Sequence, residues 1–268
     1  MRRIAHISDL HFGTVDSQIA EGLLRDLAQL EPHLVAVSGD LTQRAKRSEF
    51  RAARAFLDRI PQPKVIVPGN HDVPLYDVIS RFLKPWNRYR QFITHEMHPF
   101  FQDEEIAVAG VNTARSNAWK EGRISLAQIE ILRDRFNSAP DHLFKVLVSH
   151  HPFIPPEGDR NVAVVGRGLQ ALRMLESTGC SLILSGHLHQ VYSGDVRPYH
   201  LEIRRSILVA QAGTAISARR RGEANAYNMV TLNGDEMELE SRAWDEQQFV
   251  ATSIRRFQTS DLGWIAKS

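Results

Sequence analysis

Residues 65–72 read VIVPGNHD, a short apolar run that breaks at Pro-Gly and continues directly into an amide, an imidazole and a carboxylate. A short run rich in β-branched residues is typical of a strand buried on both faces. Asn70, His71 and Asp72 follow at the point where this strand ends. A surface turn also accepts such residues, so their meaning depends on whether other strands end in the same way.

Other apolar runs of similar length recur along the chain, and each is followed by polar residues. They are IAHIS (4–8), LVAVS (34–38), IAVAGV (106–111), KVLVS (145–149) and SLILS (181–185). Amphipathic helical patterns, at 19–30 and 125–136, lie between several of these runs. Strands that alternate with helices predict βαβ units, a parallel or mixed sheet, and helices on the outside.

The last third of the chain has a different pattern. From about residue 190 strands and turns dominate, as in 200–213 and 228–244, where Asn233-Gly234 is a strong hairpin signal. We therefore expect a second, more antiparallel sheet in the same domain. The absence of repeats, low-complexity tracts and flexible linkers predicts that residues 1–268 form a single domain. The sequence beyond about residue 250 shows no pattern that predicts a particular structure.

Composition and charge narrow the class of protein. The chain of 268 residues is 43% hydrophobic and 24% charged, which is ordinary for a soluble globular protein. Its net charge of +2 gives no overall attraction to nucleic acid or anionic membranes, so such binding requires a local patch. A single cysteine, Cys180, suits a reducing compartment. With no secretory signal and no membrane-spanning stretch, we expect a cytoplasmic protein and leave peripheral membrane contact open.

The residues that follow the strands share one chemistry. They are Asp9, His11, Asp40, Asn70, His71, Asp72, His150, His151, His187 and His189. Because the carboxyl ends of strands in open α/β sheets line one crevice, we expect these groups to converge. Oxygen and nitrogen donors without thiolate suit Mn, Fe, Zn or Co. Since one metal cannot use so many ligands, two metal ions are the economical interpretation. Gly39, Gly69 and Gly186 permit sharp turns and close approach there.

The blocks DxH, GD, GNHD, HHP and GHxH occur in this order between residues 9 and 189, and the pattern resembles the calcineurin-like metallophosphoesterases. That family includes purple acid phosphatases, cyclic nucleotide phosphodiesterases and several nucleases. The resemblance implies a four-layer αββα sandwich, in which two mixed β-sheets are flanked by helices. It also implies that one metal is held by Asp9, His11, Asp40 and His189, and that Asp40 bridges to a second metal, completed by Asn70, His150 and His187.

Such a centre implies a mechanism. Two metals ~3.5–4 Å apart clamp the attacking and leaving oxygens of an in-line displacement, and they lower the pKa of bound water so that a metal-bound hydroxide attacks. His71, which is not needed as a ligand, then contacts the phosphoryl oxygens or protonates the leaving oxygen. We expect Asp72 to sit behind His71, to fix the orientation of the imidazole and to raise its pKa.

Several residues outside the metal blocks leave alternatives open. His151 neighbours the expected site as either a substrate-binding or a packing residue. Arg219 and Arg221 either reach over the metals to grip a phosphate or belong to a surface loop. The cations of 43–54 have the spacing of a solvated helix face. The apolar stripe in 73–92, interrupted by Pro85, either packs on the domain, covers the metals beside the substrate, or meets a lipid surface.

The prediction is a metal-dependent phosphoric diester hydrolase that acts on a cyclic nucleotide or another small phosphodiester; the preference for diesters follows from the resemblance to small bacterial phosphodiesterases. A nuclease is one alternative, and it requires a continuous basic groove with strongly salt-dependent binding. A hydrolase of lipid-linked nucleotide pyrophosphates is another, and it requires an exposed stripe at 76–89. A non-catalytic interaction scaffold is the third, although such a protein should have lost ligands. The oligomeric state is not predicted.

Overall fold

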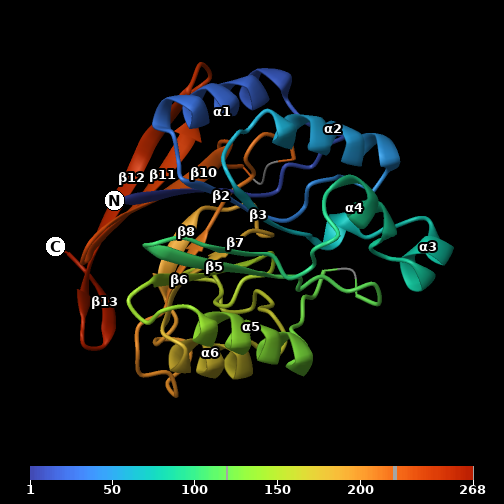
Figure 1. Ribbon diagram of the computed structural model, residues 1–268. Coiled ribbons are helices and arrows are strands. Elements are labelled where there is room, and N and C mark those ends of the chain that lie inside the picture. The colour runs from blue at the N-terminus through green and yellow to red at the C-terminus, as the bar shows by residue number, and fades with distance from the viewer. Residues whose placement is uncertain (119, 220–221, 268) are drawn as a thin grey trace.

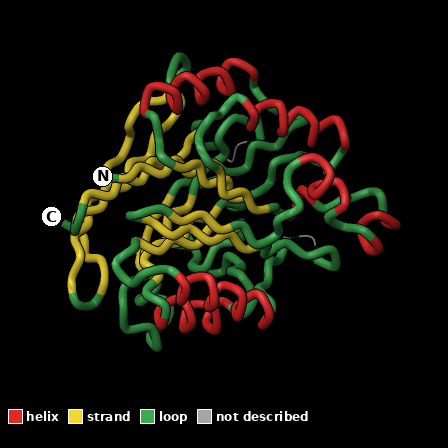
Figure 2. The backbone as a smooth tube through the Cα atoms, viewed as in Figure 1, coloured by secondary structure: helices red, strands yellow, loops and turns green. Residues whose placement is uncertain are grey.

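The computed structural model describes residues 1–118, 120–219 and 222–267. Two mixed β-sheets lie face to face, and helices cover their outer faces (Figure 1). The tube view shows the same order of layers, with helices above and below the strands (Figure 2). The predicted α/β sandwich of two mixed sheets flanked by helices is therefore confirmed.

The first sheet joins the start of the chain to its end. Its strand order is β13-β12-β11-β10-β1-β2-β3. The parallel strands are β1 (Arg2–Ile7), β2 (Leu34–Ser38) and β3 (Lys64–Val67). The antiparallel strands are β10 (Ala226–Asn233), β11 (Glu236–Trp244), β12 (Phe249–Ser260) and β13 (Gly263–Ala266). β10 pairs antiparallel with β1, and Ile4 lies opposite Val230.

The second sheet is built from the middle of the chain, in the order β4-β5-β6-β7-β9-β8. Its parallel centre contains β5 (Ile106–Val111), β6 (Phe144–Ser149), β7 (Cys180–Ser185) and β9 (Leu208–Gln211). Two antiparallel edge strands, β4 (Phe100–Gln102) and β8 (Tyr192–Asp195), complete it. All six residues of β5 and of β7 are buried, as expected for strands covered on both faces.

The expected separate sheet in the last third of the chain is wrong. The hairpin at Asn233-Gly234 forms, but β10 to β13 extend the first sheet, whereas β8 and β9 extend the second. Within the expected strand 200–213, only residues 208–211 form a strand, β9. The physical reason is that β1 would otherwise leave the backbone groups of one edge unpaired inside the protein, and β10 satisfies them.

Helices α1 (Ser17–Leu30) and α2 (Arg47–Asp58) cover the first sheet, and α5 (Leu126–Ser138) and α6 (Gly168–Ser177) cover the second (Figure 1). Local sequence sets where they begin: the Asp16 side chain accepts from two N–H groups at the start of α1, and Ser125 and Gln128 form a capping box on α5. A third apolar layer, which includes Val65, Val108 and Val146, fills the space between the sheets.

The segment 73–92 divides into two short helices around Pro85, α3 (Val78–Leu83) and α4 (Asn87–Phe92). α4 is anchored in the protein, because Tyr89 is fully buried and its hydroxyl donates to the Ile66 carbonyl at 3.1 Å. α3 is not anchored in this way, since its large apolar side chains are exposed. The packing alternative therefore holds for the second half of the stripe only. Among the described residues, no helix has the length and apolar character needed to cross a bilayer.

Candidate metal centre

The predicted metal ligands converge at the carboxyl ends of parallel strands from both sheets. Asp9 and His11 follow β1, and Asp40 follows β2. The remaining predicted ligands come from three further strand ends: Asn70 lies in the 3-10 turn η1 (Asn70–Asp72) after β3, His150 follows β6, and His187 and His189 follow β7. Parallel strands end at the same edge of a sheet, so segments far apart in sequence meet at one place.

Asp9, His11 and His189 form the first group of donors. The Nε2 atom of His11 lies 3.6 Å from Oδ1 of Asp9, and the Nε2 atom of His189 lies at the same distance from that oxygen. The two imidazole rings stack with their centroids 5.1 Å apart. One donor atom from each residue lies within 4.8 Å of the others. Three donors thus face one small space.

A second group surrounds the Asn70 amide. Its Oδ1 atom lies 3.0 Å from Nε2 of His150 and 3.0 Å from Nδ1 of His187. Asp40 lies between the two groups, because its Oδ1 is 3.4 Å from Nε2 of His150 and its Oδ2 is 3.8 Å from Nε2 of His11. The carboxylate of Asp40 therefore connects the two groups of donors.

Buried polar atoms at this place fit a metal. Oδ1 of Asp9 and Nε2 of His11 are buried and have no hydrogen-bond partner among the described residues. An unpaired buried polar group costs about 1–3 kcal/mol, so a folded protein rarely keeps two of them side by side. A divalent cation accepts lone pairs from both atoms and removes that cost. The donor set, carboxylate and imidazole without thiolate, suits transition metals.

The backbone at the donors is strained. Nine non-glycine residues in the described chain have positive φ. Five of them are predicted ligands: Asp9 (φ 53°), His11 (φ 46°), Asp40 (φ 50°), His187 (φ 80°) and His189 (φ 59°). Each such residue costs on the order of 1–3 kcal/mol and persists only where its surroundings fix it. The fold therefore gives up some stability to direct these side chains.

Two glycines provide the room that the donors need, as expected. A Cβ atom on Gly69 would lie 2.1 Å from Oδ1 of Asp40. Gly39 has φ of +92°, and a Cβ atom there would lie 2.7 Å from Nδ1 of His150. Real Cβ atoms do not approach other heavy atoms so closely, so a side chain at either position displaces a donor.

The remaining ring nitrogens of the histidines are held by groups that the sequence did not single out. Nδ1 of His150 donates to the Ser38 carbonyl at 2.8 Å, and Nδ1 of His189 lies 2.6 Å from the Thr214 hydroxyl. Such contacts fix the orientation of a metal-binding imidazole and its tautomer. Thr214 lies just after β9 in the structure, so the rule that identified the other strand ends also applies to it; the pattern at 200–213 did not show where that strand ends.

Charge coupling within the site is strong. Although burial opposes it, the neighbouring Asp40 carboxylate raises the pKa of His150 to about 9. Burial, together with the charge of His150, lowers the pKa of His187 to about 3. A metal bound at His150 must therefore displace a proton, which makes binding weaker in acid.

Asp72 does not lie behind the His71 ring, and our expectation is wrong on this point. Its Oδ2 accepts from the N–H groups of Leu41 and Gly69, and its Oδ1 accepts from the N–H and the hydroxyl of Thr42. Burial and the nearby charge of Asp40 raise the pKa of Asp72 to about 6. Asp72 joins the loops after β2 and β3, and in this way it positions the backbone around Asp40.

His71 is oriented by a backbone group instead. Its Nδ1 lies 2.8 Å from the Gln43 carbonyl and donates to it, which leaves Nε2 as the nitrogen that faces away from Gln43. Nη1 of Arg219 lies 2.8 Å from that Nε2 atom and 3.4 Å from Oε1 of Gln43. Burial lowers the pKa of His71, opposite to the expected rise. Arg219 is exposed beside the site, as the phosphate-gripping alternative requires, and Arg221 lies outside the described residues.

His151 is buried beside the second group. Its Nδ1 lies 2.7 Å from the Thr113 hydroxyl, and its Nε2 has no hydrogen-bond partner among the described residues. Its ring centroid is 4.6 Å from that of His187. His150, His151 and His187 together offer three nitrogens within 4.8 Å of one another. His151 is thus close enough to support a ligand and too deeply buried for a surface role.

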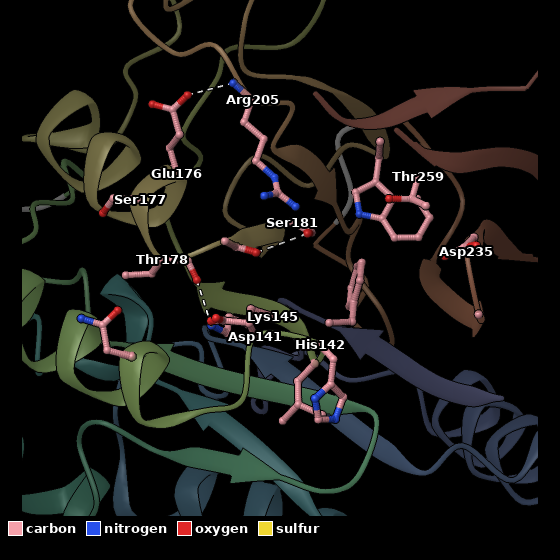
Figure 3. Close-up of a pocket in the computed structure, with 16 residues that line it drawn as sticks. Asp141, His142, Lys145, Glu176, Ser177, Thr178, Ser181, Arg205, Asp235 and Thr259 are labelled. Atoms are coloured by element: carbon pink, nitrogen blue, oxygen red, sulfur yellow. Dashed lines mark hydrogen bonds and ion pairs between the residues drawn. The ribbon is translucent and has the colours of Figure 1, made fainter. Parts of the chain in front are cut away.

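A cavity of about 510 Å³ lies elsewhere in the protein (Figure 3). Lys145 and Ser181, at the amino-terminal ends of β6 and β7, line it. Figure 3 shows the Lys145 ammonium directed at the Thr178 carbonyl, to which it donates at 3.0 Å. The predicted ligands do not line this cavity; they follow the opposite ends of the same strands, so it is separate from the candidate metal centre.

Two mixed sheets with carboxylates and imidazoles gathered at their strand ends define an α/β sandwich protein with a candidate metal centre. The chain belongs to the calcineurin-like phosphoesterase family, whose sequence profile matches residues 2–191. The predictions of the family and of a metal-dependent phosphoesterase are confirmed.

Similar proteins agree with this assignment. A probable cyclic nucleotide phosphodiesterase from Synechococcus is 24% identical over 70% of this chain and 74% of its own length. Another from Pseudoalteromonas is 23% identical over 90% of this chain and 91% of its own length. The solved structure of a dimetal phosphatase from Danio rerio superposes with a TM-score of 0.67 at 12% identity, covering 93% of this chain and 98% of that one. The last comparison supports the fold alone.

Proposed function

We propose that the chain is a dinuclear metal-dependent phosphodiesterase that hydrolyses small phosphodiesters such as cyclic nucleotides. The observation that carries the proposal is the pair of donor groups that share Asp40, whose two oxygens face His150 and His11. The preference for diesters is supported by the two bacterial relatives, both of which are named probable cyclic nucleotide phosphodiesterases. We further propose that residues 1–268 form one domain, because both sheets contribute to the apolar layer between them.

The proposed ligands follow from the two groups. Asp9, His11 and His189 hold one ion, and Asn70, His150 and His187 hold the other, while Asp40 contacts both. Mn, Fe, Zn and Co fit these donors. When bound, two such ions would neutralise charge on the phosphoryl oxygens and lower the pKa of a bound water molecule.

Other side chains act on the substrate. Arg219 grips a non-bridging phosphoryl oxygen, because its guanidinium is exposed beside the donors and an arginine pairs well with phosphate oxygens. His71 delivers a proton to the leaving oxygen through Nε2, since Nδ1 is held by the Gln43 carbonyl. A phosphoryl anion next to the ring adds negative charge and raises the pKa of His71 from its lowered value. His151 supports His187 from behind, and Asp72 holds the Asp40 loop.

A panel of substrates tests the proposal. Mn-loaded protein is assayed with an aryl phosphomonoester, an aryl phosphodiester, 2′,3′- and 3′,5′-cyclic nucleotides, single-stranded DNA and a nucleotide-sugar lipid. We expect a small diester to give the highest kcat/KM, by about tenfold or more over the monoester. A monoester that is hydrolysed faster, or activity confined to DNA and lost steeply with salt, would contradict the proposal.

A further inference from the structure

The turn before α3 and α3 itself expose five large apolar side chains, Tyr76, Val78, Ile79, Phe82 and Leu83, which we call the α3 patch. Their exposed fractions range from 58% to 75%. These residues are five of the eleven exposed large hydrophobic residues in the described chain, and they occur within eight positions of sequence. Single exposed apolar residues are normal in soluble proteins, whereas a cluster of this kind marks a contact surface.

The helix is inverted relative to an ordinary surface helix. Its cationic residue, Arg81, is 4% exposed and donates to the carbonyls of Pro74 at 3.2 Å and Ala118 at 2.7 Å. Its apolar residues Phe82 and Leu83 face solvent. α3 lies at the periphery of the molecule, away from both sheets (Figure 1). Because the buried hydrogen bonds of Arg81 fix the orientation of the helix, the fold itself directs the apolar side chains toward solvent.

The surroundings of the patch are basic. Residues 73–92, which carry the patch, contain four Lys or Arg and a single acidic residue, Asp77. The Arg44 guanidinium lies 5.4 Å from the centroid of the Tyr76 ring, and Lys84 is exposed at the end of α3. The acidic residue next to the patch, Asp77, is paired with Arg88 at 2.6 Å. Apolar side chains and cations therefore occur on one surface.

We propose that the α3 patch docks on the surface of a bilayer that contains anionic lipids. Exposed apolar side chains enter the boundary between headgroups and acyl chains, and neighbouring cations such as Arg44 and Lys84 meet the phosphates. This inference goes beyond the hydrolase activity, and it does not depend on which phosphoester the metal centre cleaves.

A second copy of the chain fits the patch less well. In a two-fold contact through α3, Lys84 of each copy would lie near the cations beside the patch of the other copy. These like charges repel each other. A helix of six residues is also only about 9 Å long, whereas a standard interface uses about 800 Å² on each partner. Charge and size therefore both favour an anionic lipid surface.

Vesicle co-sedimentation of the full-length protein tests the proposal. Vesicles of phosphatidylcholine with about 30% phosphatidylserine are compared with vesicles of phosphatidylcholine alone. We expect binding to the anionic vesicles, and weaker binding when salt is added. For the double variant Ile79→Asp/Phe82→Asp, the partition coefficient onto these vesicles should fall by about tenfold or more, because two apolar side chains no longer enter the bilayer. Leu201→Asp, at an apolar residue with 89% exposure far from α3 in sequence, is the matched control and should bind like the parent.

A charge variant distinguishes binding to anionic lipid from nonspecific adsorption. Lys84→Glu should weaken binding to the anionic vesicles, and Arg173→Glu, an exposed cation on α6, should not. Sedimentation velocity of the same proteins reports self-association. Failure of the parent to bind anionic vesicles overturns the proposal, and so does equal binding by Ile79→Asp/Phe82→Asp. Self-association that disappears in this variant, without vesicle binding by the parent, assigns the patch to a second copy instead.

Discussion

The α3 patch begins six residues after Asn70 of the candidate metal centre, and the two regions depart from ordinary protein structure in opposite directions. At the metal centre, carboxylates and imidazoles are buried, and Oδ1 of Asp9 has no hydrogen-bond partner among the described residues. In the α3 patch, Ile79 and Leu83 are about three-quarters exposed. In most proteins polar side chains face water and large apolar ones face the core.

The difference lies in how each region is held. The donors sit on strained backbone, next to glycines that no other residue could replace without a clash, so their geometry is fixed from several sides. The α3 patch is held mainly by capping at Asp77 and by the buried Arg81. We infer that the centre tolerates almost no substitution and the patch tolerates many, and each prediction below tests one side of this contrast.

The largest expected effect is at Asp40. Asp40→Asn should lose both metal ions and reduce turnover by about 10³-fold or more, because the shared carboxylate contacts both donor groups. Metal analysis and steady-state kinetics measure the two losses. Asp141→Asn is the matched control, since Asp141 is fully exposed at the opposite end of the sheet. Retention of both metals by the Asp40→Asn variant contradicts the shared role.

His71→Ala should lower turnover by roughly 10²–10⁴-fold while both metals remain bound, because the imidazole handles a proton without being a ligand. The loss should be smaller for substrates whose leaving group needs no proton, such as a nitrophenyl ester. His142→Ala, at an exposed histidine, serves as the control. An equal loss for every leaving group would assign His71 to positioning rather than proton transfer.

Gly69→Ala tests how tightly the centre is packed. The added Cβ would lie 2.1 Å from Oδ1 of Asp40, so either the carboxylate or the loop must move. We expect the free energy of unfolding of the metal-loaded protein to fall by about 1–3 kcal/mol and metal affinity to decrease. Gly168→Ala, whose added Cβ meets only ordinary contacts from 3.4 Å, should change neither. Denaturant unfolding monitored by circular dichroism measures the free energy of unfolding, and metal titration measures the affinity.

Arg219→Ala should raise KM about tenfold and leave kcat within a few-fold, since the guanidinium grips the substrate and does not bind the metals. Arg173→Ala provides the comparison on a distant helix. If kcat falls and KM does not change, Arg219 acts in the transition state only, and its role as a general phosphate grip is wrong.

The smallest effect is expected in the patch. Ile79→Asp/Phe82→Asp should leave turnover of a water-soluble diester unchanged and shift the free energy of unfolding by no more than about 0.5 kcal/mol, because the replaced side chains touch solvent. Kinetics and thermal unfolding measure this directly. A large loss of either would mean that α3 supports the site, and the contrast between the two regions would not hold.

Much of the fold and of the donor set was predictable because parallel strands place their ends at one edge. The five motif blocks needed only that rule, and the structure brings Asp9, Asp40 and His187 within one cluster. Which sheet the strands of the last third of the chain join was not predictable. Local sequence patterns identify a hairpin such as β10-β11, but they do not indicate which strand it pairs with. The pairing of β10 with β1 spans more than two hundred residues.

Side-chain contacts over short distances were also beyond the sequence. Asp72 follows His71 directly, yet its carboxylate turns to the N–H groups of three other residues, while the Gln43 carbonyl takes the place next to the ring. Adjacent residues in a 3-10 turn point in different directions, so neighbours in sequence need not be neighbours in space. The inverted face of α3 was hidden for a similar reason: the carbonyls that hold Arg81 come from the surrounding loops.

Metal analysis combined with activity tests the central claim most directly. Purified protein, reconstituted with Mn and freed of excess metal, should contain about two ions per chain and hydrolyse a diester. Removal of the ions with a chelator should abolish activity, and adding Mn back should restore it. A chelated protein that holds no transition metal and remains fully active would contradict the proposed dinuclear centre.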